Sequence, residues 1–271
     1  MLNLEKNNQY IIAGPCSIES QEQIYDIAFE LNKLGINHLR GGAFKPRTSP
    51  KSFQGLGEDG LHYLKNAADK YGMKVVSEVM DSNQLEKYID LIDIVQVGSK
   101  NMMSYEFLKQ VGRITAQKKK PVLLKRGFNS TLQEFLFSAE YISEMGNSDI
   151  LLCLRGIRTF EQIDSKMRFT PDLAGIIELK ERLGELKYPV LFDPSHAAGN
   201  SKYVIDLSKA AILLGADGLL IETHLSPEDA LSDGEQSVLP EELKKILDYI
   251  ENIKLWFPKL FNLTIPKLKF V

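Results

Sequence analysis

The chain has 271 residues, of which 44% are hydrophobic and 25% are charged, the balance of an ordinary globular protein with a large core. A formal net charge of −3 excludes a general attraction to nucleic acid or to an anionic membrane surface. Its two cysteines, Cys16 and Cys153, are too few for a disulfide framework. Because no signal peptide or bilayer-length apolar run is visible, we expect a cytoplasmic protein without nucleic-acid or membrane partners.

Short apolar segments alternate with segments of helical periodicity along the chain. We expect strands at residues 10–13, from about 37 into the loop that follows, and at 74–79, 93–98, 121–125, 150–154, 189–193 and 218–222. We expect helices at residues 20–34, 59–71, 83–89, 105–113, 131–144, 173–183, 204–214 and 241–253. An unusually long polar loop, ending near residue 170, separates the sixth strand from its helix.

Eight such strand–helix units predict an α/β protein with a single (β/α)8 TIM barrel. A doubly wound open sheet is the alternative, but it would usually show a break in composition or a Gly-x-Gly-x-x-Gly turn, and the sequence has neither. We expect one domain over residues 1–271, with a short N-terminal lead (1–9) and an apolar C-terminal tail (254–271).

Ionisable residues follow every predicted strand, whereas the middles of the strands carry almost none. In a (β/α)8 barrel the catalytic groups gather at the carboxyl ends of the strands. In chain order these ends provide Cys16; Arg40, Lys45 and Arg47; Glu78; Lys100; Lys125 and Arg126; Arg155 and Arg158; Asp193 and His196; and Glu222 and His224. This density favours an active site over chance decoration of the loops.

One subset of these residues is cationic: Arg40, Lys45, Lys100, Lys125, Arg126 and Arg155. The glycine-rich stretch 39–50 contributes two of them, and glycines let a backbone approach a ligand closely. That stretch alone would also suit a solvated basic loop. Six converging cations would repel each other unless an anion lay among them, so the full set predicts a multiply charged phosphate ester as ligand.

The other subset combines a thiol, an imidazole and two carboxylates. Cys16, His196, Glu222 and the later Asp233 are donors that suit a divalent transition metal. Taken singly, Cys16 is more often a small core residue, His196 a structural histidine and Asp233 a turn residue. The predicted convergence of the first, seventh and eighth strands is what favours a metal site.

These residues lie in six motifs that together resemble one enzyme family. The motifs are GPCS (14–17), LRGGAFKPRTSP (39–50), LKRG (124–127), RGIRTFE (155–161), DPSH (193–196) and LSDG (231–234). Between residues 8 and 250 the chain resembles the short type I beta branch of the 3-deoxy-D-arabino-heptulosonate-7-phosphate (DAHP) synthases. The resemblance implies a metal-dependent (β/α)8 barrel that condenses phosphoenolpyruvate with erythrose 4-phosphate, the first step of the shikimate pathway to chorismate and the aromatic amino acids.

The resemblance also implies roles for individual residues. Cys16, His196, Glu222 and Asp233 would hold one divalent ion of the Mn, Fe, Co or Zn class. Around phosphoenolpyruvate it implies Arg40, Lys100, Lys125 and Arg155, with Lys45 reaching between the two substrates. Around erythrose 4-phosphate it implies Pro46, Arg47, Thr48, Ser49 and, at the hydroxyls, Asp193. It also implies Glu78 near the attacking water, so that the catalytic set is Lys45, Glu78, Lys125 and Asp193.

Two positions depart from the family pattern, and two alternatives stay open. Lys100 stands where the family usually has arginine, and Leu154 stands where a glutamate is expected.

The related 3-deoxy-manno-octulosonate-8-phosphate (KDO8P) synthases use arabinose 5-phosphate, but there an asparagine takes the place of Pro46. A barrel that only binds phosphorylated metabolites is the other alternative. The resemblance further implies a homodimer or homotetramer and leaves room for a separate chorismate mutase as regulatory partner. Regulation in that family often resides in added domains, and residues 1–9 are too few to form one, so we expect no strong feedback by aromatic amino acids within this chain.

Overall fold

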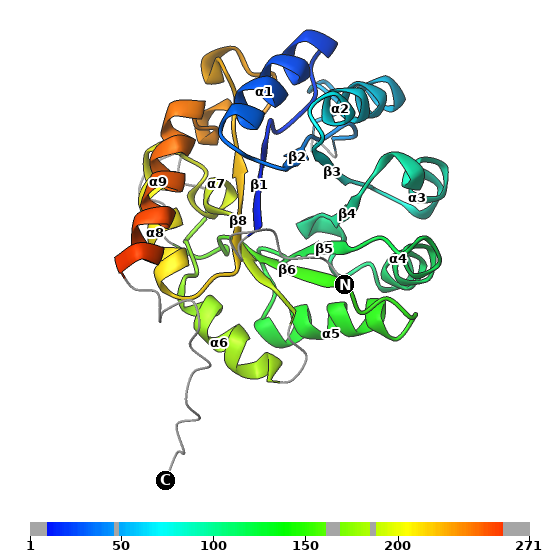
Figure 1. Cartoon of the computed structure of the whole chain (residues 1–271). Coiled ribbons are helices and arrows are strands. Elements are labelled where there is room, and N and C mark those ends of the chain that lie inside the picture. Colours follow the sequence, from blue (N-terminus) through cyan, green and yellow to red (C-terminus); the bar gives the residue numbers. More distant parts are fainter. Residues whose placement is uncertain (1–9, 46–48, 161–168, 185–187, 257–271) are drawn as a thin grey trace.

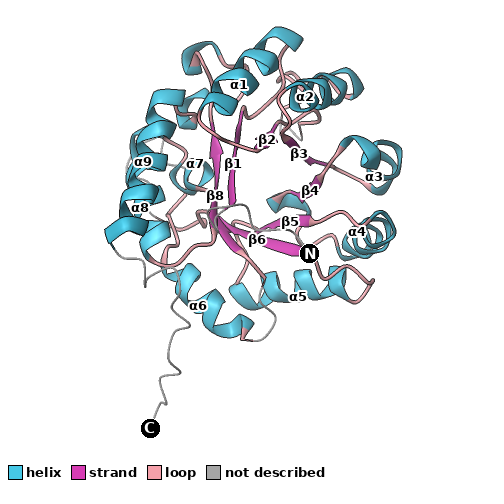
Figure 2. Cartoon of the chain, in the orientation of Figure 1, coloured by secondary structure: helices cyan, strands magenta, loops and turns pink. Residues whose placement is uncertain are grey.

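The computed structural model describes residues 10–45, 49–160, 169–184 and 188–256, with side chains as far as residue 253. Eight parallel strands close into a barrel in which spatial order follows chain order and the last strand pairs with the first (Figure 1). Helices surround the barrel (Figure 2). The closed sheet confirms the single (β/α)8 barrel and excludes the doubly wound alternative.

The strands are β1 (Tyr10–Gly14), β2 (His38–Arg40), β3 (Lys74–Glu78), β4 (Ile94–Val97), β5 (Val122–Lys125), β6 (Ile150–Leu154), β7 (Val190–Phe192) and β8 (Gly218–Glu222). The α-helices are α1 (Gln21–Lys33), α2 (Glu58–Lys70), α3 (Ser82–Tyr88), α4 (Tyr105–Lys118), α5 (Leu132–Ser143), α6 (Ala174–Leu183), α7 (Pro194–Ala198), α8 (Val204–Leu213) and α9 (Pro240–Trp256). Single 3-10 turns are η1 (Ile89–Leu91), η2 (Ser99–Asn101), η3 (Ser201–Tyr203), η4 (Pro227–Asp229) and η5 (Gly234–Gln236). None of these described helices is long and apolar enough to cross a membrane.

Three helices differ from the sequence-based expectation. α4 continues past residue 113 to Lys118, where Lys119 takes a left-handed conformation that ends the helix. α7 was not expected, because five residues are too few to show helical periodicity. α9 continues to Trp256, into the segment from residue 254 that was expected to be tail.

Two layers of apolar side chains hold the barrel together. Alternate strand residues point to opposite faces, so one set fills the inside of the barrel: Tyr10, Ile12, Val76, Ile94, Leu123, Leu151, Cys153, Leu191 and Leu220. The other set packs between the strands and the helices. The interior layer forms a solid support beneath the carboxyl ends of the strands, where the polar residues lie.

We predict that Leu151→Ala destabilises the barrel by about 2–5 kcal/mol, the range for removing a fully buried leucine and leaving a cavity. Leu151 has no exposed surface and lies in the interior layer. Equilibrium urea unfolding followed by far-UV circular dichroism measures the effect. Leu213→Ala, at a side chain that is 46% exposed, is the matched control. Equal losses for the two variants would contradict a packed interior.

Candidate active site

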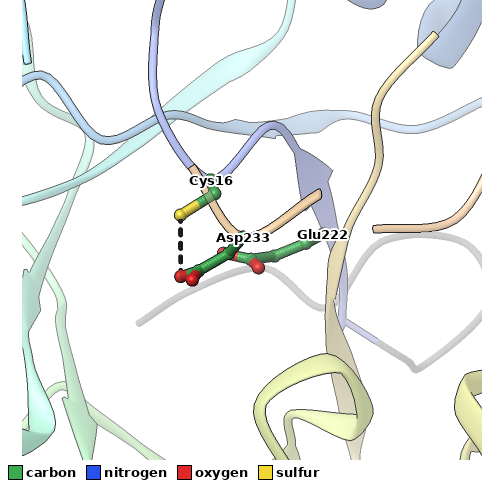
Figure 3. Close-up of side chains that lie close together, drawn as sticks. All are labelled: Cys16, Glu222 and Asp233. Atoms are coloured by element: carbon green, nitrogen blue, oxygen red, sulfur yellow. Dashed lines mark hydrogen bonds between the residues drawn. The ribbon is translucent and has the colours of Figure 1, made fainter. Parts of the chain in front are cut away.

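Three of the four predicted metal ligands converge at the carboxyl end of the barrel. Cys16 follows β1, Glu222 ends β8 and Asp233 lies in the loop after β8. One sulfur or carboxylate oxygen from each lies within 4.8 Å of the others (Figure 3). The Cys16 Sγ donates a hydrogen bond to the Asp233 Oδ2 at 3.2 Å. Cys16 and Glu222 are buried and Asp233 is half-buried.

His196 lies beside this group of three and connects it to Asp193. Its Nε2 is 3.5 Å from the Glu222 Oε1, and its Nδ1 is 2.7 Å from the Asp193 Oδ2. Asp193 is the N-cap of α7, and its Oδ1 accepts a hydrogen bond from the His196 backbone N–H at 2.8 Å. Pro194 occupies the first helical position, which suits proline. Asp193 therefore holds His196 through two contacts, one to its backbone N–H and one to its ring nitrogen Nδ1.

Cationic side chains partner the acidic and thiol groups one by one. The Arg40 Nη1 donates to the Glu222 Oε1 at 2.6 Å. The Lys45 Nζ contacts the Cys16 Sγ at 3.0 Å and donates to the Cys16 carbonyl oxygen at 2.9 Å. The fully buried Asp193 accepts a short hydrogen bond from Lys125. The buried carboxylates of Glu222 and Asp193 thus each have a positive partner, which offsets the cost of removing them from water.

The surroundings shift the pKa of both Cys16 and Glu222. Burial raises the pKa of the Cys16 thiol to about 12, and the charge of Glu222 adds to this effect. Burial also acts against ionisation of Glu222, but His196 and Arg40 outweigh it and lower the pKa of that carboxyl to about 2. Without a metal, the site therefore combines an ionised carboxylate with a protonated thiol.

The pKa values of Asp193 and His196 are shifted as well. Burial acts against ionisation of Asp193, but His196 and Lys125 outweigh it and hold the pKa of Asp193 well below its usual range. Burial lowers the pKa of His196, even though Asp193 and Glu222 favour the protonated ring. An imidazole that loses its proton readily is suited to bind a metal through the nitrogen that faces Glu222.

The donors fit a divalent transition metal. A sulfur, two carboxylates and an imidazole nitrogen are typical of that class, whereas Mg²⁺ and Ca²⁺ prefer oxygen alone. The thiol must lose its proton when a metal binds. Gln236, which is buried in η5, was missed by the sequence analysis: its Nε2 donates to the Glu222 Oε2 at 2.5 Å. No sequence pattern links Gln236 to Glu222, and only the folded loop brings them together.

Arg155 is held by aromatic rings and a backbone carbonyl. Its guanidinium centre lies 4.4 Å from the ring centroid of Phe169 and 6.0 Å from that of Phe128. Its Nη2 donates to the His196 carbonyl oxygen at 3.2 Å. Leu154 precedes Arg155 at the position where the family pattern has glutamate. Arg155 therefore lies beside two aromatic rings and has no carboxylate from the preceding residue. The two phenylalanines lie in loops, and the sequence analysis missed them.

Arg126 is the cation whose environment differs most from expectation. Its Nη1 donates to the Asp172 Oδ2 at 2.6 Å, and its Nε and Nη2 donate to the Ser130 carbonyl oxygen at 3.1 and 2.8 Å. These bonds join the loops before α5 and α6. Arg126 therefore links these two loops, in addition to belonging to the predicted set of six cations.

The other predicted residues lie at the rim or outside the described part. Glu78 ends β3 and accepts a hydrogen bond from the Gln96 Nε2 at 3.0 Å. Lys100 lies exposed in η2, next to Ser99, whose hydroxyl is 3.5 Å from the Arg155 Nη1. Ser49 is exposed. Pro46, Arg47 and Thr48 lie outside the described residues.

Comparisons with known proteins place the chain in a family. The model of the DAHP synthetase I family matches residues 4–255. The chain is 49% identical over 245 residues to the phospho-2-dehydro-3-deoxyheptonate aldolase of Thermotoga maritima, covering 88% of this chain and 70% of that protein. It is 29% identical over 263 residues to the 2-dehydro-3-deoxyphosphooctonate aldolase of Francisella tularensis subsp. holarctica, covering 90% of each.

Solved structures agree with this assignment. The crystal structure of the Thermotoga maritima aldolase (DAHP synthase) superimposes with a TM-score of 0.84 at 47% identity, covering 94% of this chain and 71% of that one. A truncated form of 3-deoxy-D-arabino-heptulosonate 7-phosphate synthase from the same organism gives a TM-score of 0.80 at 43% identity, covering 94% and 89%. Both the sequence and the barrel therefore match over most of the chain, and the chain belongs to the DAHP synthetase I family.

Proposed function

We propose that this chain condenses phosphoenolpyruvate with erythrose 4-phosphate to give DAHP and inorganic phosphate, the first step of the shikimate pathway. The observation that carries the proposal is the convergence of a transition-metal donor set with buried cations at one end of the barrel. Family membership supports a carbon–carbon bond-forming transferase over a barrel that only binds metabolites. The identity of 49% to a heptonate enzyme, against 29% to an octonate enzyme, favours the four-carbon acceptor.

Cys16, His196, Glu222 and Asp233 would hold the divalent ion in this proposal. When bound, such an ion supplies a Lewis acid that polarises the aldehyde of erythrose 4-phosphate. The thiolate favours the Mn, Fe, Co or Zn class, since it is a soft ligand. Asp193 orients His196 and Lys125 through the contacts described above. The resemblance adds contacts between Asp193 and the acceptor hydroxyls.

The cations would position the anionic substrate groups. Arg40, Lys125 and Arg155 come from the ends of β2, β5 and β6 and would bind the carboxylate and phosphate of phosphoenolpyruvate, with Lys100 at the rim. Lys45 would reach between the two substrates, and the segment 46–49 would bind the acceptor phosphate. Positioning two reactants in this way contributes up to about 7–11 kcal/mol in favourable cases.

The reaction then balances as follows. The methylene carbon of phosphoenolpyruvate attacks the aldehyde carbon, forming the new carbon–carbon bond and leaving cationic character at C2. The aldehyde oxygen takes up a proton and becomes a hydroxyl group. Water adds at C2 and gives one proton to Glu78, which balances the proton that the aldehyde oxygen takes up. The bond from C2 to the phosphate oxygen then breaks, the departing phosphate takes the proton of the new C2 hydroxyl, and the C2 carbonyl of DAHP forms. Lys125, whose ammonium group faces Asp193, is the other candidate for moving a proton.

From the family resemblance we further propose manganese as one candidate for the physiological metal, a homodimer or homotetramer, and regulation by a separate chorismate mutase. From the sequence we propose a cytoplasmic location.

We predict that Cys16→Ala removes most of the bound metal and most of the activity. It deletes the soft ligand, so the loss should exceed the roughly 10- to 100-fold that follows removal of a residue which only supports a ligand. Metal content after dialysis and phosphate release measure the two effects. Cys153→Ala, in the barrel interior, is the matched control and should keep its metal. Wild-type metal content in Cys16→Ala would refute the ligand assignment.

We predict that erythrose 4-phosphate is a better acceptor than arabinose 5-phosphate. Pro46 offers neither a side-chain amide nor a backbone N–H, and an unpaired buried hydroxyl costs about 1–3 kcal/mol, which corresponds to roughly 5- to 150-fold in kcat/KM. Steady-state rates with each aldose phosphate at saturating phosphoenolpyruvate and added Mn²⁺ decide the question. An equal or higher kcat/KM for arabinose 5-phosphate would identify the chain as an octulosonate synthase instead.

We predict that Phe169→Leu raises KM for phosphoenolpyruvate more than it lowers kcat. Loss of a cation–π contact worth about 0.5–2 kcal/mol corresponds to roughly 2- to 30-fold weaker binding through Arg155. Steady-state kinetics at saturating erythrose 4-phosphate measures both constants. Phe169→Tyr keeps the aromatic face and should stay near wild type. If the Tyr and Leu variants lose equally, shape rather than the ring face holds Arg155.

A further inference from the structure

The loops that carry Cys16 and Asp233 are joined by a cluster of polar side chains. These two loops follow β1 and β8, the strands that close the barrel. We call the cluster the loop latch; it consists of the side chains of Ser17, Glu19, Gln23, His224 and Ser232 together with the backbone N–H of Leu231. The latch lies outside the set of groups assigned to metal or substrate, and the sequence analysis assigned no role to Ser17, Glu19, Gln23 or Ser232.

The shortest bond of the loop latch joins the immediate neighbours of the two ligands. The hydroxyls of Ser17 and Ser232 lie 2.7 Å apart, and both side chains are buried. Ser17 directly follows Cys16, and Ser232 directly precedes Asp233. This bond therefore joins the two loops one residue away from each ligand.

Glu19 makes the second link between the loops. Its Oε1 accepts a hydrogen bond from the Leu231 backbone N–H at 2.9 Å and one from the Ser17 hydroxyl at 3.3 Å. One carboxylate oxygen thus bridges the β1 loop and the β8 loop. Its Oε2 lies 3.8 Å from the His224 Nε2.

Gln23 ties the loop latch to the first turn of α1. Its Oε1 accepts from the Glu19 backbone N–H at 3.1 Å, and its Nε2 donates to the Ser17 carbonyl oxygen at 3.2 Å. The same Nε2 lies 3.1 Å from the His224 Nε2. A helix that packs on the barrel therefore holds the loop from which Glu19 reaches across.

Asp233 depends on such support more than the other ligands do. Its backbone is left-handed, at φ 51° and ψ 32°, a conformation that aspartate adopts as a single residue in turns. Unlike Glu222, it comes from a long loop and not from a strand. The hydrogen bond from the Ser237 hydroxyl to the Asp233 carbonyl oxygen lies within that same loop, so it does not join the β8 loop to Cys16.

We propose that the loop latch sets the position of Asp233 relative to Cys16, and that Glu19 is thereby a positioning residue for metal binding. The inference rests on the proposed metal site. Removing a residue that only orients ligands typically lowers metal affinity by about 10- to 100-fold. We expect that loss for Glu19→Ala, and a comparable loss for Ser232→Ala.

The test is the affinity of the folded full chain for Mn²⁺ by equilibrium dialysis, together with the ultraviolet thiolate-to-metal band of the Co²⁺ form. In Glu19→Ala the Mn²⁺ affinity should fall about 10- to 100-fold, and the Co²⁺ band should weaken or shift. Activity lost at low Mn²⁺ should return as Mn²⁺ is raised. Glu19→Gln should recover most of the affinity, because its amide oxygen can still accept from the Leu231 N–H.

Ser20→Ala is the matched control. Ser20 lies in the same loop, is exposed, and caps α1 by accepting from the Gln23 backbone N–H at 3.0 Å. We expect it to lower the melting temperature while keeping wild-type affinity for Mn²⁺. Equal losses of affinity in Ser20→Ala and Glu19→Ala would overturn the proposal, since they would reflect general loosening of the loop.

Failure of the inference can be told from failure of the metal site. If Cys16→Ala loses Mn²⁺ but Glu19→Ala binds it as wild type does, the loop latch has no positioning role. If the wild type itself binds neither Mn²⁺ nor Co²⁺, the metal site is wrong and the inference falls with it. Should Glu19→Ala not fold, Ser232→Ala decides the question by the same two readouts, and wild-type affinity there overturns the proposal.

Discussion

The pairing of β1 with β8 is the constraint on which the site depends. Five residue pairs are in register, and the last places Gly14 opposite Glu222. Gly14 has a φ of 144°, and a Cβ there would lie 2.1 Å from the Arg40 carbonyl oxygen. Only glycine lets β1 and β2 meet so closely at this point. Because Cys16 follows two residues later, closure of the barrel delivers the first thiol and the last strand carboxylate to the same place.

Charge compensation is what makes such a crowded site tolerable. Three negative or thiol groups each have a cationic partner, through Arg40, Lys45 and Lys125. Such pairs add little net stability, since desolvation offsets their attraction, but removing one member leaves the other charge buried and alone. The site is therefore held together by mutual dependence, and most of the folding free energy comes from the apolar layers beneath and around it.

The sequence was sufficient for the barrel and for the group of residues at its carboxyl end, for reasons visible in particular elements. The strands are short apolar runs, and strand ends in this fold converge whatever the loops do. What could not be predicted depends on contacts between distant loops. Nothing near Gln236 indicates that it bonds Glu222, and nothing near Phe128 or Phe169 indicates that they flank Arg155. Arg126 looked like its cationic neighbours until the fold gave it Asp172 as partner.

The short helix α7 has a consequence for how this chain tolerates change in length. Asp193 caps the helix and Pro194 is its first residue. The His196 backbone N–H donates to the capping side chain, and the His196 ring lies against Asp193 and Glu222. All of these relations depend on a spacing of three residues. An insertion or deletion between 193 and 196 would break the cap and misdirect the imidazole in one event, whereas many single exchanges at the exposed surface of the helices would break neither. Over evolution this segment should therefore keep its length.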